Sequence, residues 1–277
     1  MNKLSTAKRI QVVAALVEGN SIRATVRMTG VAKNTVVKLL VELGEACARF
    51  QDEALRDLYC EHLQADEIWS FCYAKAKNVP EEHRDEFGYG DVWTFTALDA
   101  DTKLVPSWMV GPRDLWTASA FMQDVVSRLH GRVQLTTDGH VMYLDAVESA
   151  FGSAVDFAQL QKLYGVPPEA EKRYSPAECL GTITQVMQGN PDPAHISTSY
   201  VERQNLTMRM SMRRFTRLTN GFSKKLANLI AAVSLHFMHY NFCRKHQTLA
   251  GKTPAMAAGV TDHVWSVEEV LALLDSN

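Results

Sequence analysis

The chain has 277 residues, enough to bury a sizeable core and carry a small second domain, and its 46% hydrophobic and 22% charged content is ordinary for a globular protein. Residues 1–50 hold eight basic and three acidic side chains. Residues 51–202 hold eleven basic and 24 acidic side chains, and residues 203–261 hold ten basic and no acidic ones. Two basic flanks around an acidic centre indicate a polyanion held by the flanks and carboxylate chemistry between them, and no apolar run is long enough for a membrane span.

The five cysteines are scattered and show no C-x-x-C spacing. They are typical of reduced, buried thiols in a cytosolic protein rather than of disulfides or a zinc site. The N-terminus has no signal-peptide pattern. We therefore expect a cytoplasmic protein without a membrane partner.

The N-terminal part predicts three helices, because apolar side chains recur at helical spacing in residues 6–18, in residues 21–29 and from about residue 32 onward. Gly19 and Gly30 are typical helix ends. Two short helices joined by a short turn with Gly predict a helix-turn-helix, although a plain three-helix bundle is an alternative. Four side chains at the start of the third helix would face outward toward base edges and phosphates: Lys33, Asn34, Thr35 and Lys38.

A strand is predicted at residues 63–74, which are rich in β-branched and aromatic side chains. Asp66 and Glu67 are consecutive in it. Side chains alternate between the two faces of a strand, so we expect only one of this pair to join a site.

The rest of the centre alternates between strands and helices. A hairpin turn at residues 99–102 is followed by a helix at 117–129, a strand at 133–140 with Asp138 near its end, and a helix at 141–151. A further strand is expected from residue 155. This order predicts an α/β fold with a mixed sheet, and the prolines and glycines of residues 165–198 indicate an irregular insertion.

The segment 199–225, SYVERQNLTMRMSMRRFTRLTNGFSKK, opens with one acid, Glu202, and continues as a basic run. If its first half is helical, Glu202, Asn205 and Arg209 share a face. A solvated, salt-bridged helix is the alternative, but such a helix usually mixes charges of both signs, so a polyanionic partner is favoured. Nine side chains of this part of the chain are candidates for DNA contact: Arg203, Arg209, Arg213, Arg214, Arg217, Lys224, Lys225, Arg244 and Lys245.

Three histidines, His236, His239 and His246, lie on or after a helix expected at residues 227–241. Two of them are three residues apart and could hold a metal ion. No carboxylate is near them in the sequence, so packing or phosphate contact is favoured.

Three carboxylates stand at the predicted element ends: Asp66, Asp138 and Glu202. In-line displacement at phosphorus is served by two divalent ions about 3.5–4 Å apart. Carboxylate oxygens are the ligands that Mg²⁺ prefers. We therefore expect Asp66, Asp138 and Glu202 to be catalytic and to bind two Mg²⁺ or Mn²⁺ ions.

The segments ADEIWSF and TTDGH, together with residues 199–225, resemble the three acidic motifs of insertion-sequence DDE transposases, most closely those of the IS-one type. The ending YNFCRKHQTLAGKTPAMAAGV resembles the YNxxRPHxxLxxxTPxxxA ending shared with retroviral-type integrases, with Lys245 in place of the proline. SIRATVRMTGVAKNTVVKLL resembles bacterial resolvase- and transposase-type DNA-binding domains. The resemblance implies a ribonuclease-H-like core in which the three acids bind divalent metals and Arg209 contacts terminal DNA.

We accordingly predict a helix-turn-helix DNA-binding domain and linker helix in residues 1–55, a ribonuclease-H-like DDE catalytic domain in residues 56–250 and a C-terminal tail in residues 251–277. The expected function is a transposase that binds the terminal inverted repeats of an insertion sequence and catalyses metal-dependent strand cleavage and strand transfer. Its partners would be double-stranded DNA and at least one further copy of the chain, in the nucleoid of a bacterial cytoplasm.

Two alternatives remain open at the level of sequence. One is a catalytically silent DNA-binding repressor derived from a transposase. The other is a nuclease of the same fold that cuts without regard to the repeat ends.

Overall fold

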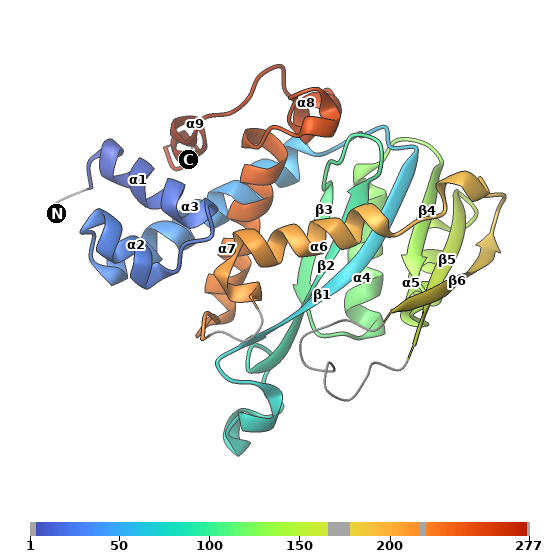
Figure 1. Ribbon diagram of the computed structural model, residues 1–277, viewed down its shortest axis with the longest axis horizontal. Helices are drawn as coiled ribbons and strands as arrows, with labels where there is room; N and C mark the ends of the chain where they lie inside the picture. The colour runs from blue at the N-terminus through green and yellow to red at the C-terminus, as the bar shows by residue number, and fades with distance from the viewer. Residues whose placement is uncertain (1–3, 166–177, 217–219, 276–277) are drawn as a thin grey trace.

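The computed structural model describes residues 4–165, 178–216 and 220–275. Figure 1 shows a helical part, which holds both chain ends, beside a sheet with helices on its two faces. Buried apolar side chains form one continuous core across both parts, from Val12 and Leu43 among the helices to Phe95 and Phe121 around the sheet. Within the described residues, no helix is both long and apolar enough to cross a membrane.

Three helices open the chain: α1 (Thr6–Val17), α2 (Ile22–Thr29) and α3 (Lys33–Ala54). Ser5 and Ser21 cap the first two, because each side chain accepts a hydrogen bond from a backbone N–H of the first turn. Gly30 ends α2 with φ 71°, a left-handed conformation that glycine adopts without strain. The three helices predicted from the sequence are therefore present.

The described residues form a sheet of six strands in the order β3-β2-β1-β4-β5-β6. The strands are β1 (His62–Cys72), β2 (Gly90–Asp99), β3 (Ser107–Gly111), β4 (Val133–Asp138), β5 (Val155–Tyr164) and β6 (Cys179–Gln188). β1, β4 and β5 run parallel, whereas β2, β3 and β6 are antiparallel to their neighbours. The protein is thus an α/β protein with a mixed sheet, compatible with a ribonuclease-H-like core.

Strand β6 corrects the prediction that residues 165–198 are irregular. It pairs antiparallel with β5 from Phe157–Gln188 to Tyr164–Cys179, with two register shifts. Nearly all of its side chains are exposed, so the backbone ladder to β5 holds it in place and no alternation of burial marks it in the sequence. Cys179, expected to be buried, is a free and exposed thiol at its start.

Helices cover both faces of the sheet. α4 (Leu115–Arg128) and α5 (Met142–Phe151) pack against each other on one face, and α6 (Ser199–Ser211) crosses the opposite face in contact with β1 and β2 (Figure 1). The two faces of β1 therefore meet different helices. A side chain on β1 reaches either α5 or α6 according to its position in the strand.

The C-terminal part begins with α7 (Leu226–Met238), continues through one π-helical turn (His239–Cys243), and ends with the short helices α8 (Pro254–Ala257) and α9 (Val267–Ala272). α7 lies against α3 and joins the N-terminal helices to the rest of the molecule. Short 3₁₀ turns complete the described elements: Ala76–Asn78, Glu81–His83, Pro193–His195, Arg213–Phe215 and Gln247–Leu249.

Contact between α3 and α7 depends on Gly44. A Cβ atom built at Gly44 would lie 2.5 Å from both the Cα atom and the carbonyl oxygen of Ala231. The side chain of Ser234 donates a hydrogen bond to the carbonyl oxygen of Gly44 at 2.7 Å. The two helix backbones therefore approach more closely than any residue with a side chain would permit at this position.

His236 is a packing residue, as the sequence favoured. It is buried on α7, and 3.3 Å separates its Nε2 atom from the Nε2 atom of Gln204 on α6. Burial lowers the pKa of His236 from 6.5 to about 3, with further contributions from His239 and Arg244. The imidazole is therefore neutral in the folded protein at neutral pH.

We expect His236 to make the protein less stable as the pH falls. The unfolded chain takes up a proton on this histidine below about pH 6.5, but the folded protein does so only near pH 3, so stability is lost through that window. Between pH 6.5 and pH 5 the loss is about 2 kcal/mol. Urea unfolding of wild type and of His236→Gln across these pH values measures this loss of stability. The other titrating groups contribute equally to both proteins, so the difference between the two free energies of unfolding isolates the effect of His236. If the free energy of unfolding changes equally with pH in both proteins, His236 is not held neutral. The control is His130→Gln, because His130 is exposed and its replacement should leave the pH dependence unchanged.

Candidate active site

The register between β1 and β4 brings two of the predicted acids together. Ala65 pairs with Thr137 in parallel register, so the next residues, Asp66 and Asp138, emerge side by side. β4 ends at Asp138 while β1 continues, which opens the sheet at this point. The carboxyl ends of parallel strands are where α/β sheets place their sites.

Glu67 joins the same group, contrary to the expectation that only one residue of the pair could. Carboxylate oxygens of Asp66, Glu67 and Asp138 all lie within 4.8 Å of one another. The faces do alternate, since Glu67 reaches α5 and Asp66 reaches α6. Two features explain why the carboxylate oxygens still meet. First, β4 ends at Asp138, so no β4 backbone separates the two faces of the sheet beyond this point. Second, Asp66 Oδ1 turns back to accept a hydrogen bond from the N–H of Glu67 at 2.8 Å.

Glu67 is held by two strong donors. Its side chain is 1% exposed, and it accepts hydrogen bonds from Arg113 Nε and from the Tyr143 hydroxyl, both at 2.7 Å. Burial raises the pKa of Tyr143 well above its usual value, and the charge of Glu67 adds to the effect, so the phenol stays protonated and donates. Arg113 supplies the compensating positive charge. The carboxylate of Glu67 is therefore fixed in position and partly neutralised.

Helix α6 is attached to β1 beside these acids. The side chain of its N-cap residue, Thr198, accepts no hydrogen bond from the backbone N–H groups of the first turn. Instead, the side-chain oxygen of Gln64 on β1 accepts from the backbone N–H groups of Tyr200 and Val201, at 2.8 and 3.1 Å. One turn further, Asn205 Nδ2 donates to Asp66 Oδ2 at 2.8 Å, so α6 helps to orient the Asp66 carboxylate.

Glu202 lies at the edge of the acidic group rather than inside it. Its carboxylate accepts a hydrogen bond from the Thr198 hydroxyl at 2.7 Å and forms an ion pair with Lys162 of β5. Burial acts to lower the pKa of Lys162, but the hydrogen bond to Glu202 raises it overall, so the ammonium remains charged. Glu202 is close enough for its charge to raise the pKa of Asp66, as the smallest of the contributions.

The group of acids is electrostatically strained without a cation. Burial raises the pKa of Asp66 to about 7, and the charges of Glu67 and Asp138 raise it further, against the opposing hydrogen bond from the Glu67 N–H. Burial and the charge of Glu67 likewise raise the pKa of Asp138. Like charges brought together and removed from water destabilise one another, and a bound cation would relieve this. The oxygen donors fit Mg²⁺ or Mn²⁺, which favour carboxylate ligands.

The predicted DNA-contact residues are mostly on the surface. The exposed ones are Lys33, Asn34, Lys38, Arg203, Arg213, Lys224, Lys225, Arg244 and Lys245. Thr35, Arg209 and Arg214 are half-buried, and Arg217 lies outside the described residues. Seven members from distant parts of the chain line one cavity: Lys33, Asn34, Lys38, Arg213, Arg214, Lys224 and Lys225.

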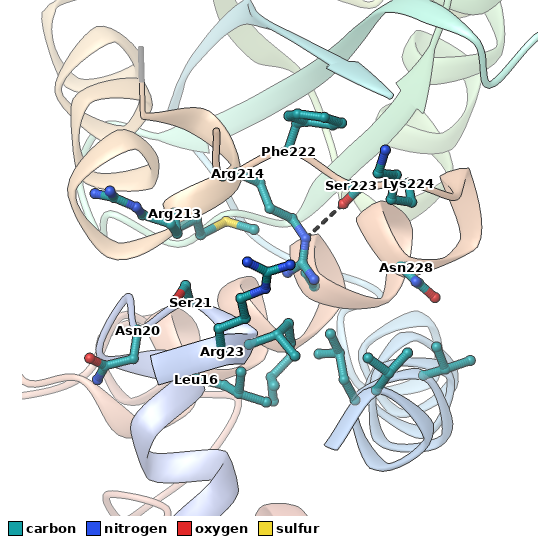
Figure 2. A pocket seen from close by; sticks show the side chains of 18 of the residues that line it. Leu16, Asn20, Ser21, Arg23, Arg213, Arg214, Phe222, Ser223, Lys224 and Asn228 are labelled. Carbon is teal, nitrogen blue, oxygen red and sulfur yellow. Dashed lines mark hydrogen bonds between the residues drawn. The ribbon is translucent and has the colours of Figure 1, made fainter. Parts of the chain in front are cut away.

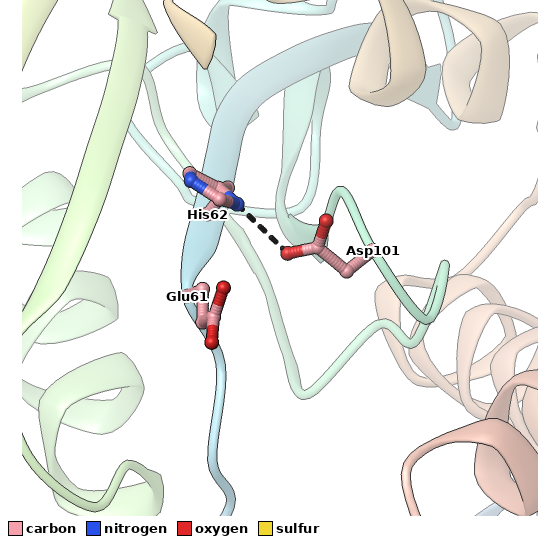
Figure 3. Close-up of side chains that lie close together, drawn as sticks. All are labelled: Glu61, His62 and Asp101. Carbon is pink, nitrogen blue, oxygen red and sulfur yellow. Dashed lines mark hydrogen bonds and ion pairs between the residues drawn. The ribbon is translucent and has the colours of Figure 1, made fainter. Parts of the chain in front are cut away.

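A second group of ligand-type side chains lies at the start of β1, formed by Glu61, His62 and Asp101 (Figure 3). His62 Nδ1 and Asp101 Oδ2 are 2.9 Å apart, and the ring of His62 stacks on that of His195 with 3.8 Å between centroids. Glu61 and Asp101 are exposed. The contact between His62 and Asp101 ties β1 to the turn after β2.

Sequence reasoning missed four residues beside the acids: Glu67, Arg113, Tyr143 and Lys162. Lys162 could have been suspected, because it lies on the strand after the one that ends at Asp138. Arg113 and Tyr143 carry no such signal, since only the folding of α5 and of the loop after β3 brings them to Glu67.

No protein-family model matches the sequence, and no curated protein is significantly similar to it. Among solved structures, the chain is similar to one described as a cryo-EM structure of the piggyBac transposase synaptic complex with hairpin DNA. The comparison covers 100% of this chain and 73% of that chain, with 11% sequence identity and a TM-score of 0.39. A likeness this distant supports no conclusion about what this chain does.

Proposed function

We propose that the chain is a DDE transposase of the insertion-sequence type, which binds terminal inverted repeats and catalyses metal-dependent DNA strand cleavage and strand transfer. The observation that carries the proposal is the meeting of Asp66 and Asp138, 72 residues apart in the sequence, at the open end of two parallel strands. Glu202 approaches them from α6, and the basic segment that follows Glu202 supplies cations for a phosphate backbone.

In this proposal Asp66, Asp138 and Glu202 hold two Mg²⁺ or Mn²⁺ ions. When bound, such ions activate the attacking oxygen and stabilise the leaving oxygen of an in-line displacement. The remaining residues have supporting roles. Asn205 orients Asp66, whereas Arg113 and Tyr143 hold Glu67 so that its charge stays close to the two aspartates. Lys162 forms an ion pair with Glu202 and so helps to hold its carboxylate in place.

The N-terminal helices α1–α3 are proposed to recognise the repeat sequence as a helix-turn-helix unit. Lys33, Asn34 and Lys38 are exposed at the start of α3, where side chains of a recognition helix would meet base edges and phosphates. Residues 1–55, 56–250 and 251–277 would be the DNA-binding domain, catalytic domain and tail. Two DNA ends must be handled together, so the active form would be a dimer or larger assembly in the bacterial nucleoid.

The test is an assay of the purified protein on labelled duplexes that end in the inverted repeats flanking its coding region. We expect strand cleavage at the repeat end with Mg²⁺ or Mn²⁺ and none with EDTA. A duplex of the same composition with a scrambled end is the matched control and should stay intact.

The same assay separates the alternatives. Specific binding of repeat ends without cleavage in any metal would identify a repressor and refute the proposed enzyme. Equal cleavage of repeat and scrambled ends would identify a general nuclease.

A further inference from the structure

A large basic cavity lies where the N-terminal helices meet the segment after α6 (Figure 2). Its volume is about 1340 Å³, and its walls come from the end of α1, the start of α2, the first half of α3, residues 211–214, residues 220–225 and α7. Seven Lys or Arg side chains line it against one acid, Glu42, which is itself paired with Lys38 at 3.5 Å. The catalytic acids proposed above are not among its lining residues.

Two arginines from distant parts of the chain point into this cavity. Figure 2 shows the side chains of Arg23, on α2, and Arg214, after α6, both reaching into the cavity that they line. Arg214 Nε donates to the Ser223 hydroxyl at 2.7 Å, and within the described residues no carboxylate forms an ion pair with either arginine. Burial lowers the pKa of Arg214 to about 10, because removing a guanidinium group from water disfavours its charged form.

Two helices also begin at this cavity without a side-chain cap. Neither Ala32, before α3, nor Lys225, before α7, makes a capping hydrogen bond, and neither first turn contains an acid. Asn34 and Asn228, from those first turns, line the cavity. The N-terminus of a helix carries partial positive charge and unpaired N–H groups, both of which favour an anion. These backbone donors therefore add to the two arginines.

We propose that this cavity binds phosphate groups of the DNA backbone and thereby couples the N-terminal helices to the catalytic part of the chain. Arg23 becomes a DNA contact that the sequence did not single out. Arg23 and Arg214, which line the cavity from different parts of the chain, would each form charge-assisted hydrogen bonds to backbone phosphates. The inference rests on the proposed function only in taking DNA as the source of the phosphate.

The test measures binding of random-sequence duplex DNA in EDTA, by fluorescence anisotropy over a series of salt concentrations. Arg23→Gln and Arg214→Gln should each weaken binding about tenfold, the effect of losing one hydrogen bond to a charged group. Each should also reduce the slope of log K against log salt by about 0.9. Arg27→Gln is the matched control, because Arg27 is exposed on the same helix as Arg23 but does not line the cavity.

A second arm separates DNA from a small free anion. Inorganic phosphate is titrated against each protein while thermal unfolding is followed. If phosphate stabilises wild type and not Arg214→Gln, yet both variants bind DNA like wild type, the cavity holds a free anion and the proposal is overturned. Unchanged DNA affinity in exposed Arg23→Gln also overturns it, even if Arg214→Gln fails to fold. The measurement needs neither metal nor cleavage. It could therefore confirm DNA binding in the cavity even for a protein that lacks nuclease activity.

Discussion

Asp138→Asn should abolish metal-dependent strand cleavage while leaving DNA affinity at the wild-type level. Asp138 is the end residue of β4, beside Asp66, and its carboxylate is one of the three that meet within 4.8 Å. Asn keeps the shape and one oxygen but removes the charge that holds a divalent ion. Loss of several kcal/mol of transition-state stabilisation corresponds to a rate lower by about 10³-fold or more. Single-turnover cleavage of a repeat-end duplex, with binding measured in parallel, gives both quantities.

Matched variants make this prediction specific. Asp66→Asn and Glu202→Gln should lose cleavage to a similar extent, whereas Asp145→Asn, exposed on α5 only seven residues further on, should cleave like wild type. Stabilisation by Mn²⁺ in thermal unfolding gives a readout besides activity, and it should vanish in Asp138→Asn. Cleavage retained by one of the three variants would remove that residue from the proposed mechanism.

Gly44→Ala should destabilise the protein by about 2 kcal/mol or more, through overpacking of a close helix contact. The direction of this change in stability is informative. Ala is a better helix former than Gly and would stabilise an unpacked helix by up to about 1 kcal/mol. Here the new methyl group would lie 2.5 Å from backbone atoms of Ala231, so no side-chain rotation relieves the clash. α3 and α7 would have to move apart, at the cost of the hydrogen bond from Ser234 to the Gly44 carbonyl. The free energy of unfolding in urea measures the effect.

Gly181→Ala is the matched control for this prediction. Gly181 lies in exposed β6, and a Cβ atom there would meet no atom within 4 Å. We expect its stability to stay within about 0.5 kcal/mol of wild type, as for other surface substitutions. A Gly44→Ala protein as stable as wild type would show that α3 and α7 do not pack as closely as described.

Local patterns in the sequence predicted most of the elements. Helices α1 to α3 follow from apolar periodicity and from the caps at Ser5 and Ser21, which are properties of short segments. Strands β1 and β4 follow from runs of apolar and β-branched residues. β6 escaped prediction because its two faces are solvated, so its side chains show no alternation and only the ladder to β5 defines it.

The composition of the candidate site was only partly predictable. The sequence singled out three candidate acids, Asp66, Asp138 and Glu202. It did so through their predicted positions at element ends and through the resemblance to known motifs. That Glu67 joins them required knowing where β4 stops and how the Asp66 side chain bends. The pairing of Glu202 with Lys162 required the neighbouring positions of α6 and β5. Similarly, Arg23 and Arg214 are 191 residues apart, and no local pattern relates them.

The sequence alone thus determined the fold class, the order of the elements apart from β6, and the separation of acidic from basic segments, because these depend on the residues within each segment. The tertiary structure decided which of those residues meet. Strand register, helix crossing at Gly44 and the capping of α6 by Gln64 set distances between groups that are far apart along the chain. Such distances depend on packing of the whole core, and no single segment encodes them.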